Sequence, residues 1–435
     1  MTIRIAQVNL WGEFVGALAL DETTNITTFE YAPEWLKNGF EIAPVRMPLS
    51  TEKYMFPGLN PETFKGLPAV FADSLPDDFG NAVIDAWLAK QGRSPRSFSS
   101  VERLLYTGNR GMGALEYSPA LRQRGKNPVG NLELESLVHM AQQILDQRAG
   151  LVVDADGGTM DNLFQIGTSA GGARAKAVIA INKKRTSIRS GQLTAPKGYE
   201  HFLLKFDGVS EKRSVSEIFS DPKGFGIMEY AYYLMARDAG IDISYSELLK
   251  EKNRAHFITR RFDRTGNEKT HFLTLCGMDH ADFKRPGSYS YEELFSVARR
   301  LHLSRNDAIE IFRRMVFNVI SRNQDDHAKN IGFLLEKDTG KWRLAPAYDV
   351  AYSYRKDSPW VASHQMSVNG KRDRFNRHDL QVVGTSCIGN FSGKDADRII
   401  DSVIDVVKKW EFYAEETGVF PWLRGEIKKH LRLNI

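Results

Sequence analysis

The sequence Asn-Gln-Asp-Asp-His-Ala-Lys-Asn-Ile-Gly-Phe, residues 323–333, places an acid and an amide five positions apart, at Asp325 and Asn330. In the protein-kinase catalytic loop, an Asp accepts the proton of the substrate hydroxyl. An Asn five residues later holds a magnesium ion against the nucleotide phosphates. A second metal-binding acid is then expected further along the chain, and Asp349 follows Phe333 after sixteen residues. This spacing predicts phosphoryl transfer.

The elements around this loop should place it beside Asp349. Apolar residues recur at helical spacing from residue 305 to residue 321, and Ser304 can serve as the N-cap, so the loop is expected to follow a buried helix. Residues 331–335 and 341–345 flank a turn and predict a β-hairpin that returns the chain toward Asp349. Helix, acidic loop, hairpin and acid occur in the order that a kinase-like site needs.

A glycine-rich stretch, Gly167-Thr-Ser-Ala-Gly-Gly-Ala-Arg-Ala-Lys176, precedes the strand-like residues 177–181. Glycines let backbone N–H groups approach phosphate oxygens, and the lysine at the end can supply positive charge. The spacing is neither that of a Walker A loop nor that of a dinucleotide fingerprint. A glycine turn before a strand is more often a plain hairpin, so this stretch is a weak signal by itself.

Lys205 is a second candidate cation, because it follows the apolar residues of His201-Phe-Leu-Leu-Lys205. A lysine inside a strand is costly to bury unless its ammonium reaches solvent or pairs with an anion. In a phosphotransferase that anion is a nucleotide phosphate, and Glu229, on a helix predicted from residue 226, could orient the lysine. If Glu229 is simply an exposed helix acid, it has no such role.

Length and composition predict a soluble protein of two or three domains. The chain has 435 residues, of which 42% are apolar and 26% charged. Its net charge of +5 permits an acidic or nucleic-acid partner without arguing for one. The two cysteines, Cys276 and Cys387, cannot form a disulfide framework or a structural zinc site, which favours the cytoplasm. The N-terminus lacks signal-peptide features, and no stretch has the roughly 18 apolar residues of a membrane span.

The rest of the chain shows further elements and one boundary. The predicted elements are a hairpin over residues 3–9 and 13–20 and amphipathic helices over residues 81–91, 134–148 and 395–416. Between the first two helices, the stretch 122–130 is polar and basic and contains Pro128. This composition predicts a domain boundary near residue 125. The C-terminal helix is expected to be scaffold.

In their order along the chain, these segments resemble the HipA family of bacterial serine/threonine kinases, toxins of type II toxin–antitoxin modules. The motifs that carry the resemblance are GTSAGGARAK (167–176), HFLLK (201–205), RFDR (261–264), DDHAKN (325–330) and AYD (347–349). In the N-terminal part, the similar segments are YAPEWL (31–36), LPDD (75–78) and GNRGMG (108–113). The resemblance therefore covers nearly the whole chain.

The resemblance implies an α+β, two-lobed protein-kinase-like fold with the nucleotide between the lobes. The implied domains are a mixed α/β N-terminal subdomain (residues 1–125), a kinase N-lobe with the glycine-rich loop (126–262) and a mainly helical C-terminal lobe (263–435). The implied cofactors are ATP and Mg²⁺. The implied partners are a small HipB-like helix-turn-helix antitoxin, operator DNA bound jointly with it, and a protein substrate such as an aminoacyl-tRNA synthetase.

The resemblance also implies roles for individual residues. Asp325 would be the catalytic base, Asn330 and Asp349 would bind Mg²⁺, and Lys205 would bind the phosphates. The residues implied around the nucleotide are Gly171, Gly172, Ala173, Arg174, Ala175 and Lys176 along the phosphates, His327 and Lys329 beside them, and Arg260, Arg261 and Phe262 around adenine. Ser169 matches the family's autophosphorylated serine. Its phosphorylation would add about two negative charges to a phosphate-binding loop and switch activity off.

Two positions depart from the family pattern. The better known HipA toxin has one acid followed by Gly in the catalytic loop, whereas this chain has both Asp325 and Asp326. We favour Asp325 as the base, since it alone stands five residues before Asn330. The segment from Thr259 to Arg261 is also more basic than is expected beside adenine.

A basic cluster in a predicted loop of the C-terminal domain contains Lys371, Arg374 and Arg377. These cations could contact DNA phosphates, which would position the protein on DNA without reading bases. A solvated charged loop explains the same residues equally well.

Two other classes of function remain open. Asp325, Asp326, His327 and Asp349 could bind divalent metals in a phosphodiester hydrolase, although such an enzyme would not need Lys205 or the glycine-rich loop. Alternatively, the chain could be a non-catalytic corepressor that assembles with an antitoxin and DNA. The number and order of the motifs favour the kinase.

Overall fold

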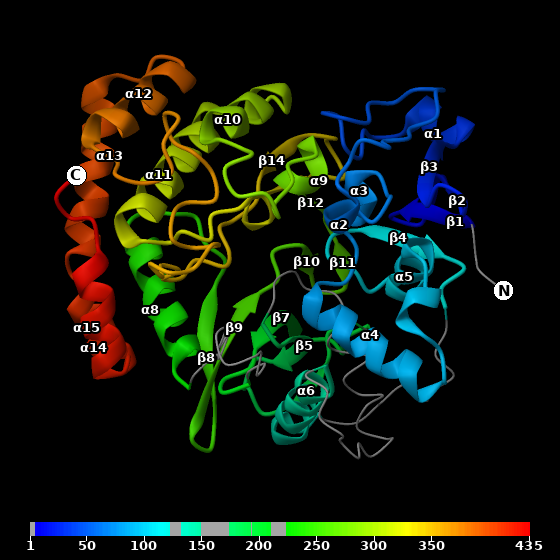
Figure 1. Cartoon of the computed structure of the whole chain (residues 1–435), viewed down its shortest axis with the longest axis horizontal. Coiled ribbons are helices and arrows are strands. Elements are labelled where there is room, and N and C mark those ends of the chain that lie inside the picture. The colour runs from blue at the N-terminus through cyan, green and yellow to red at the C-terminus, as the bar shows by residue number, and fades with distance from the viewer. Residues whose placement is uncertain (1–4, 122–131, 149–173, 193, 210–222) are drawn as a thin grey trace. The chain divides into compact units, whose positions relative to one another are not determined.

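The protein is described by a computed structural model that covers residues 5–121, 132–148, 174–192, 194–209 and 223–435 (Figure 1). The chain divides into two compact units, each built from segments far apart in sequence. The first unit comprises residues 1–41, 49–226 and 245–271, and the second comprises residues 42–48, 227–244 and 272–435. The division into domains at residues 125 and 262 stays a prediction.

The first unit begins with an antiparallel sheet in the strand order β3-β2-β1-β4. Its strands are β1 (Ile5–Leu10), β2 (Glu13–Asp21), β3 (Ile26–Tyr31) and β4 (Leu115–Ser118). The predicted N-terminal hairpin is confirmed: Leu10 pairs with Glu13. Between them, Trp11 and Gly12 both have positive φ, 52° and 88°, as the tight turn of a twisted hairpin requires. The short helices between β3 and β4 along the chain include α1 (Pro33–Asn38), α2 (Pro61–Phe64), α3 (Ala69–Ala72) and α5 (Ser100–Thr107).

A second sheet of the first unit carries the predicted phosphate-binding lysine. Its strands are β5 (Lys176–Asn182), β6 (Ile188–Ser190), β7 (Tyr199–Lys205), β8 (Ser246–Glu251) and β9 (Arg254–Arg260), in the order β6-β5-β7-β9-β8. The apolar residues of α4 (Asp78–Lys90) and α6 (Leu134–Arg148) join those of β5, β7 and β9 in one hydrophobic core. Both helices agree with the sequence prediction. Since α4 precedes residue 125, this core also unites the predicted N-terminal subdomain with the predicted N-lobe.

The second unit is mainly helical, with a three-stranded sheet in the order β12-β13-β14. The strands are β12 (His271–Thr274), β13 (Gly332–Leu335) and β14 (Trp342–Leu344). The helices are α8 (Phe225–Asp238), α9 (Leu275–Asp279), α10 (Tyr291–Arg300), α11 (Arg305–Ser321), α12 (Arg377–Cys387), α13 (Gly393–Val407), α14 (Trp410–Thr417) and α15 (Pro421–His430). The antiparallel pairing of β13 with β14 confirms the predicted hairpin.

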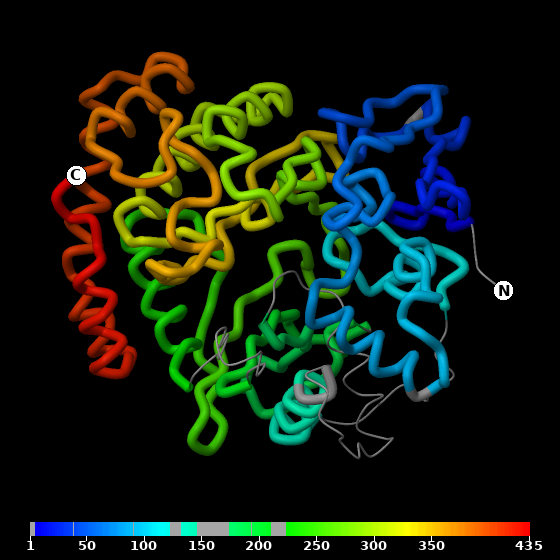
Figure 2. Tube along the Cα trace, viewed as in Figure 1, coloured from blue at the N-terminus to red at the C-terminus, as the bar shows by residue number. Residues whose placement is uncertain are grey.

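Helix α11 has the bounds that its sequence predicted. The side chain of Ser304 accepts a hydrogen bond from the Asp307 backbone, and the Asp307 side chain accepts one from the Ser304 backbone, which forms a capping box. The helix ends at Ser321 because Arg322 adopts a left-handed φ of 63°. Between Asp349 and α12, the chain forms no helix, and its trace is irregular (Figure 2).

The single helix predicted over residues 395–416 is wrong. The chain forms α13 and α14, with Lys408 and Lys409 between them. After the break, Trp410 is 1% exposed, and its indole N–H donates to the Arg424 carbonyl at 3.0 Å. The break therefore accompanies the packing of α14 against α15, which a helical period cannot reveal. No helix in the described part of the chain is long and apolar enough to cross a membrane.

Asp263 is a fully buried carboxylate in the first unit, within the short hairpin segment that leads to β10 (Arg264–Thr265) and β11 (Glu268–Lys269). It pairs with Arg261 at 2.7 Å and Arg264 at 2.8 Å, and it accepts the Gly113 N–H at 2.7 Å. Burial alone raises the pKa of Asp263, but the two guanidinium charges and the hydrogen bonds lower it well below its ordinary value. This cluster fixes the loop around Gly113.

Replacing Asp263 by Asn should destabilise the first unit by about 3–5 kcal/mol, because two buried guanidinium groups lose their counter-charge. Urea unfolding should show the lower midpoint. Glu34→Gln, which breaks an exposed ion pair with Lys37, is the control and should leave the midpoint nearly unchanged. Because the pKa of Asp263 is depressed, its stabilisation is complete above about pH 4 and declines at lower pH. Equal midpoints for the two variants would contradict this role.

Candidate functional site

The loop after α11 is closed by a hydrogen bond between the two residues that the sequence singled out. The side-chain amide of Asn330 donates to the backbone carbonyl of Asp325 at 2.8 Å. Between them, His327 caps a short 3-10 helix, Ala328–Asn330, by accepting the Lys329 N–H on Nδ1 at 3.2 Å. The five-residue spacing therefore corresponds to a direct contact, which orients the Asn330 side chain relative to Asp325.

Asp325 combines partial exposure with fixed partners. Its side chain is 33% exposed, and Oδ1 accepts the indole N–H of Trp360 at 2.8 Å. His327 Nε2 lies 3.6 Å from the same oxygen. Burial raises the pKa of Asp325, the neighbouring His327 opposes this, and the negative charge of Asp349 raises the pKa further. A reachable carboxylate with a raised proton affinity is suited to general-base chemistry.

Asp326 differs from Asp325 in burial and in its hydrogen bonds. Its side chain is fully buried, and both oxygens are hydrogen-bonded. Oδ1 accepts the Gln365 N–H at 2.8 Å, while Oδ2 accepts from the Tyr291 hydroxyl at 3.0 Å and from His364 Nδ1 at 2.8 Å. Burial raises the pKa of Asp326, but His364 and the hydrogen bonds lower it overall. Asp326 is therefore built into the scaffold, and Asp325 is the acid that a substrate can reach.

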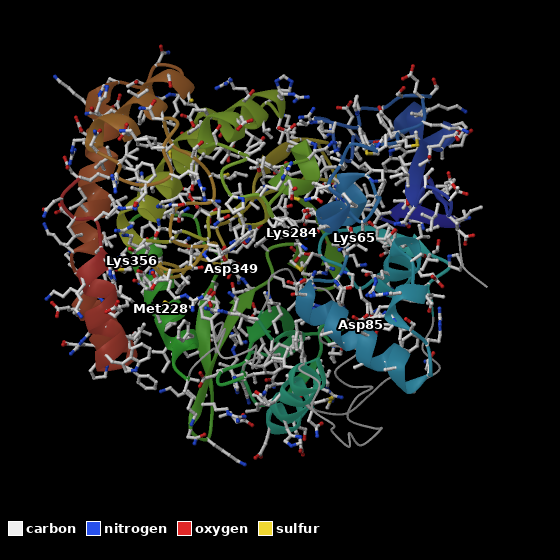
Figure 3. The ribbon with its side chains drawn as sticks, viewed as in Figure 1. Lys65, Asp85, Met228, Lys284, Asp349 and Lys356 are labelled. Atoms are coloured by element: carbon white, nitrogen blue, oxygen red, sulfur yellow. The ribbon has the colours of Figure 1, made fainter. Side chains whose placement is uncertain are left out.

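Asp349 follows β14 with a φ of 56°, a left-handed conformation that is uncommon outside glycine (Figure 3). Such backbone strain concentrates at functional sites. The preceding residue anchors this position to the loop after α11, because the Tyr348 hydroxyl donates to the Lys329 carbonyl at 2.7 Å. The amide oxygen of Asn330 and the carboxylate of Asp349 are hard oxygen ligands of the kind that Mg²⁺ prefers.

Among the described residues, no group of three or more His, Cys, Asp or Glu side chains could hold a metal ion. A pair made of one amide and one carboxylate is a different kind of site. Mg²⁺ is usually bound by one or two carboxylates together with substrate phosphates and water. Asn330 and Asp349 carry the types of oxygen ligand that a magnesium ion arriving with a nucleotide would use.

In the first unit, Lys176 and Lys205 lie opposite each other in the pairing of β5 with β7. Both are buried, and opposed residues of antiparallel strands share one face of the sheet. The Lys205 ammonium lies 5.7 Å from the ring centroid of Phe257, and the Lys176 ammonium lies 3.6 Å from Asp77. Asp77 also caps α4 by accepting the Gly80 N–H. The sequence marks Asp77 only through the family resemblance, and nothing in it signals the contact with Lys176.

The other predicted nucleotide-binding residues have varied surroundings. Ser169, Gly171, Gly172 and Ala173 lie outside the described residues. Arg174 lies 5.4 Å from the centre of the Phe225 ring, and the Ala175 carbonyl accepts the Phe206 N–H. In the segment predicted around adenine, Arg260 is half-exposed near Glu200, Arg261 is buried against Asp263, and Phe262 is partly buried. His327 and Lys329 both lie beside the ring of Phe283, at 5.5 and 5.2 Å. Glu229 is 1% exposed on α8, so it is not an exposed helix acid.

The basic cluster is only partly a loop, because α12 begins at Arg377. Lys371 pairs with Asp379 at 2.8 Å, and Arg377 pairs with Asp397 at 2.8 Å and with Asp401 at 2.5 Å. Arg374 is exposed. Sequence patterns also missed Trp360, His364 and Tyr291, because nothing in their local sequence indicates contact with an acidic loop.

Comparison with known proteins identifies two family regions. The family model described as the HipA N-terminal domain matches residues 6–118, and the HipA-like C-terminal domain matches residues 168–410. The structure is similar to that of HipA from Shewanella oneidensis MR-1, solved with HipB and operator DNA. The TM-score is 0.65 at 16% identity over 98% of this chain and 94% of that one. A proinflammatory kinase of Helicobacter pylori, CtkA, aligns over 53% of this chain and 90% of its own at 13% identity, with a TM-score of 0.31. The likeness to HipA confirms the predicted α+β, HipA-like fold.

The two adjacent acids should respond differently to truncation. Asp326→Ala leaves Tyr291, His364 and the Gln365 N–H without their buried acceptor, which should cost about 3 kcal/mol or more. Asp325→Ala removes a partly exposed carboxylate that burial disfavours, so it should change stability little. Urea unfolding of both variants and the wild type tests this expectation. A larger loss for Asp325→Ala than for Asp326→Ala would reverse the assignment of scaffold and reachable acid.

Proposed function

Because the chain belongs to the HipA family, we propose that it is a cytoplasmic, ATP-dependent serine/threonine protein kinase of the HipA toxin type. The observation that carries the proposal is the pair of environments at Asp325 and Asp326. One acid is reachable, has a raised pKa and is hydrogen-bonded through its backbone to Asn330; the other is locked in the scaffold. A kinase needs one base at a defined distance from its metal-binding amide.

In the proposed reaction, Asp325 accepts the proton of the substrate hydroxyl on Oδ2 while Trp360 holds Oδ1. Magnesium-bound ATP would supply the γ-phosphoryl group: the bond between the γ-phosphorus and the bridging oxygen breaks, and ADP leaves. Asn330 and Asp349 would hold the metal, and Lys205 would bind the phosphates. The raised pKa of Asp325 matches a base that must take a proton from an alcohol as the bond to phosphorus forms.

The remaining residues predicted around the nucleotide belong to the same proposal. Gly171 to Lys176 would line the phosphates through their backbone, with His327 and Lys329 beside them, and the segment from Arg260 to Phe262 would lie around adenine. Asp263 accepts hydrogen bonds from two nitrogens of the Arg261 guanidinium, Nε and Nη2, so this side chain is directed toward Asp263. Ser169 would be autophosphorylated, and the added charge would turn the kinase off.

The proposed partners are a HipB-like helix-turn-helix antitoxin, operator DNA and a protein substrate such as an aminoacyl-tRNA synthetase. Support for the first two comes from the solved complex of the S. oneidensis HipA with HipB and its operator DNA. Two alternative functions must be distinguished from the kinase by experiment. One is a non-catalytic corepressor with the same partners, and the other is a metal-dependent hydrolase.

Purified protein incubated with Mg²⁺ and γ-labelled ATP should label itself on Ser169, as mapped by mass spectrometry. Asp325→Asn and Asp349→Asn should abolish labelling, and chelation of Mg²⁺ should do the same. Asp357→Asn, an exposed acid in the segment after Asp349, is the matched control and should label normally. ATP binding without labelling would favour the corepressor. No ATP binding at all would favour the hydrolase.

Ser169→Ala tests the proposed off-switch separately. The variant should retain ATP binding and remain active toward a protein substrate after prolonged incubation with ATP, whereas the wild type should lose activity as label accumulates. Identical labelling of the two proteins at the same positions would contradict the assignment of Ser169.

Replacing Lys371, Arg374 and Arg377 by Ala tests the proposed binding of DNA by the basic cluster. If these cations neutralise phosphates within the antitoxin complex, the dependence of log K on log salt should become shallower by about 0.9 for each phosphate that the variant no longer neutralises. Lys183, Lys184 and Lys197 are exposed cations elsewhere, and their replacement by Ala is the charge-matched control. A slope equal to that of the control would refute the proposed role in DNA binding, and a solvated loop would explain the cluster.

A further inference from the structure

Asp326 is next to the proposed base, but it cannot act on a substrate directly. Its side chain is fully buried, and its three hydrogen bonds come from Tyr291, His364 and the Gln365 backbone. A carboxylate whose two oxygens are both engaged can influence the reaction only through the chain that it holds. That chain is the catalytic loop, because Asp325 and His327 are its immediate neighbours.

Asp326 and Arg432 together determine which nitrogen of His364 carries the proton. The guanidinium Nη1 lies 3.0 Å from His364 Nε2. A guanidinium group only donates hydrogen bonds, so Nε2 must be the acceptor and the ring proton must be on Nδ1, which faces Asp326 at 2.8 Å. His364 therefore donates from Nδ1 to the buried acid and accepts from the cation at Nε2.

Arg432 also connects this pair to the helix that leads into the catalytic loop. Its backbone N–H donates to the Ile320 carbonyl at 2.9 Å, and its Nη1 donates to the Val319 carbonyl at 3.2 Å. Both acceptors lie in the last turn of α11. The guanidinium group is held in turn by an ion pair with Asp373. A chain of hydrogen bonds therefore runs from the end of α11 through Arg432 and His364 to Asp326.

The segment that carries His364 contacts the proposed base as well. Trp360, four residues earlier, donates to Asp325 Oδ1 at 2.8 Å. Ser358 fixes the turn before it by accepting the N–H groups of Trp360 and Val361, each at 3.2 Å. One short segment, residues 358–365, thus holds both neighbouring acids. It binds one oxygen of Asp325, and in the described part of the chain no hydrogen bond occupies the other.

We propose that His364 is a positioning residue: through Asp326 it fixes the catalytic loop, so that Asp325 keeps the orientation that Trp360 completes. This role rests on the kinase function proposed above. A displacement of a reacting group by about 1 Å can cost about 10²-fold in rate. Loss of His364 should therefore lower the rate of phosphoryl transfer. The affinity for ATP is expected to stay unchanged, since Lys205 lies on β7, outside this loop.

The test measures autophosphorylation of the full-length protein over a series of Mg-ATP concentrations, which gives a limiting rate and a half-saturating concentration. His364→Leu, which has no donor for Asp326, should lower the limiting rate by about 10²-fold at an unchanged half-saturating concentration. His364→Asn can place an amide N–H where Nδ1 was and should recover most of the rate. His378→Asn, an exposed histidine on α12, should match the wild type.

Arg432→Met keeps the idea testable if His364→Leu does not fold. It leaves Asp326 and His364 in place and removes the donor that faces Nε2, so the limiting rate should again fall. The ¹⁵N resonances of the histidine side chains should show an Nδ1–H ring for His364 in the wild type. In Arg432→Met the Nε2 resonance should shift, because this nitrogen loses its hydrogen-bond donor. This measurement does not depend on enzymatic activity.

Several outcomes would overturn the role. The first is a folded His364→Leu or Arg432→Met protein whose limiting rate equals that of the wild type. The second is a fall in the limiting rate accompanied by an equal rise in the half-saturating ATP concentration. The third is a wild-type His364 that carries its proton on Nε2. If the wild-type protein is not labelled although its His364 shows the Nδ1–H tautomer, the proposed kinase function fails, and the positioning role fails with it.

Discussion

The burial of a fully hydrogen-bonded Asp326 is the interaction on which the geometry of the candidate site depends. A buried carboxylate is tolerated only when donors satisfy both oxygens. Here the donors come from the start of α10 and from the segment after Asp349. Meeting this requirement brings the segment 358–365 onto the loop after α11. The same placement sets Trp360 against Asp325.

Two chemically identical neighbours acquire different properties through their surroundings. Asp325 keeps one-third of its side chain exposed and has a raised pKa, while Asp326 is sealed and has a lowered one. Environments that push the pKa values of adjacent titratable groups apart are a general way to divide roles between them. In this chain the division separates an acid that holds the loop from an acid that a hydroxyl can reach.

In the first unit, Asp263 is likewise a buried carboxylate stabilised by several donors. Two guanidinium groups and a backbone N–H surround this carboxylate, which fixes the loop at Gly113 next to the segment that follows β9. A buried charge that loses its partner destabilises the fold, so the loss of any one group in this network leaves the others unpaired. Two of the motifs that carry the family resemblance, around Arg261 and around Asp326, thus also hold loops in place.

The sequence by itself determined the elements that depend on local rules. Helix α11, with its Ser304 cap, helix α6, the N-terminal hairpin and the β13–β14 hairpin follow from periodicity, capping and turn chemistry, which act over a few residues. The five-residue spacing of Asp325 and Asn330 indicates a phosphoryl-transfer pattern, and the hydrogen bond between them is a finding of the structure. The break between α13 and α14 was not predicted, because it accompanies packing of Trp410 against a later helix.

Only the tertiary structure decided which of the two acids is reachable and which is scaffold. Spacing favours Asp325, but the distinction in burial comes from Tyr291, Trp360, His364 and Arg432. These residues lie between 34 and 107 positions away from Asp325 along the chain. The tertiary structure also decided that Lys176 meets Asp77, a residue 99 positions earlier. Local sequence encodes how the backbone turns, whereas burial and the partners of a charge depend on which distant segments fold against it.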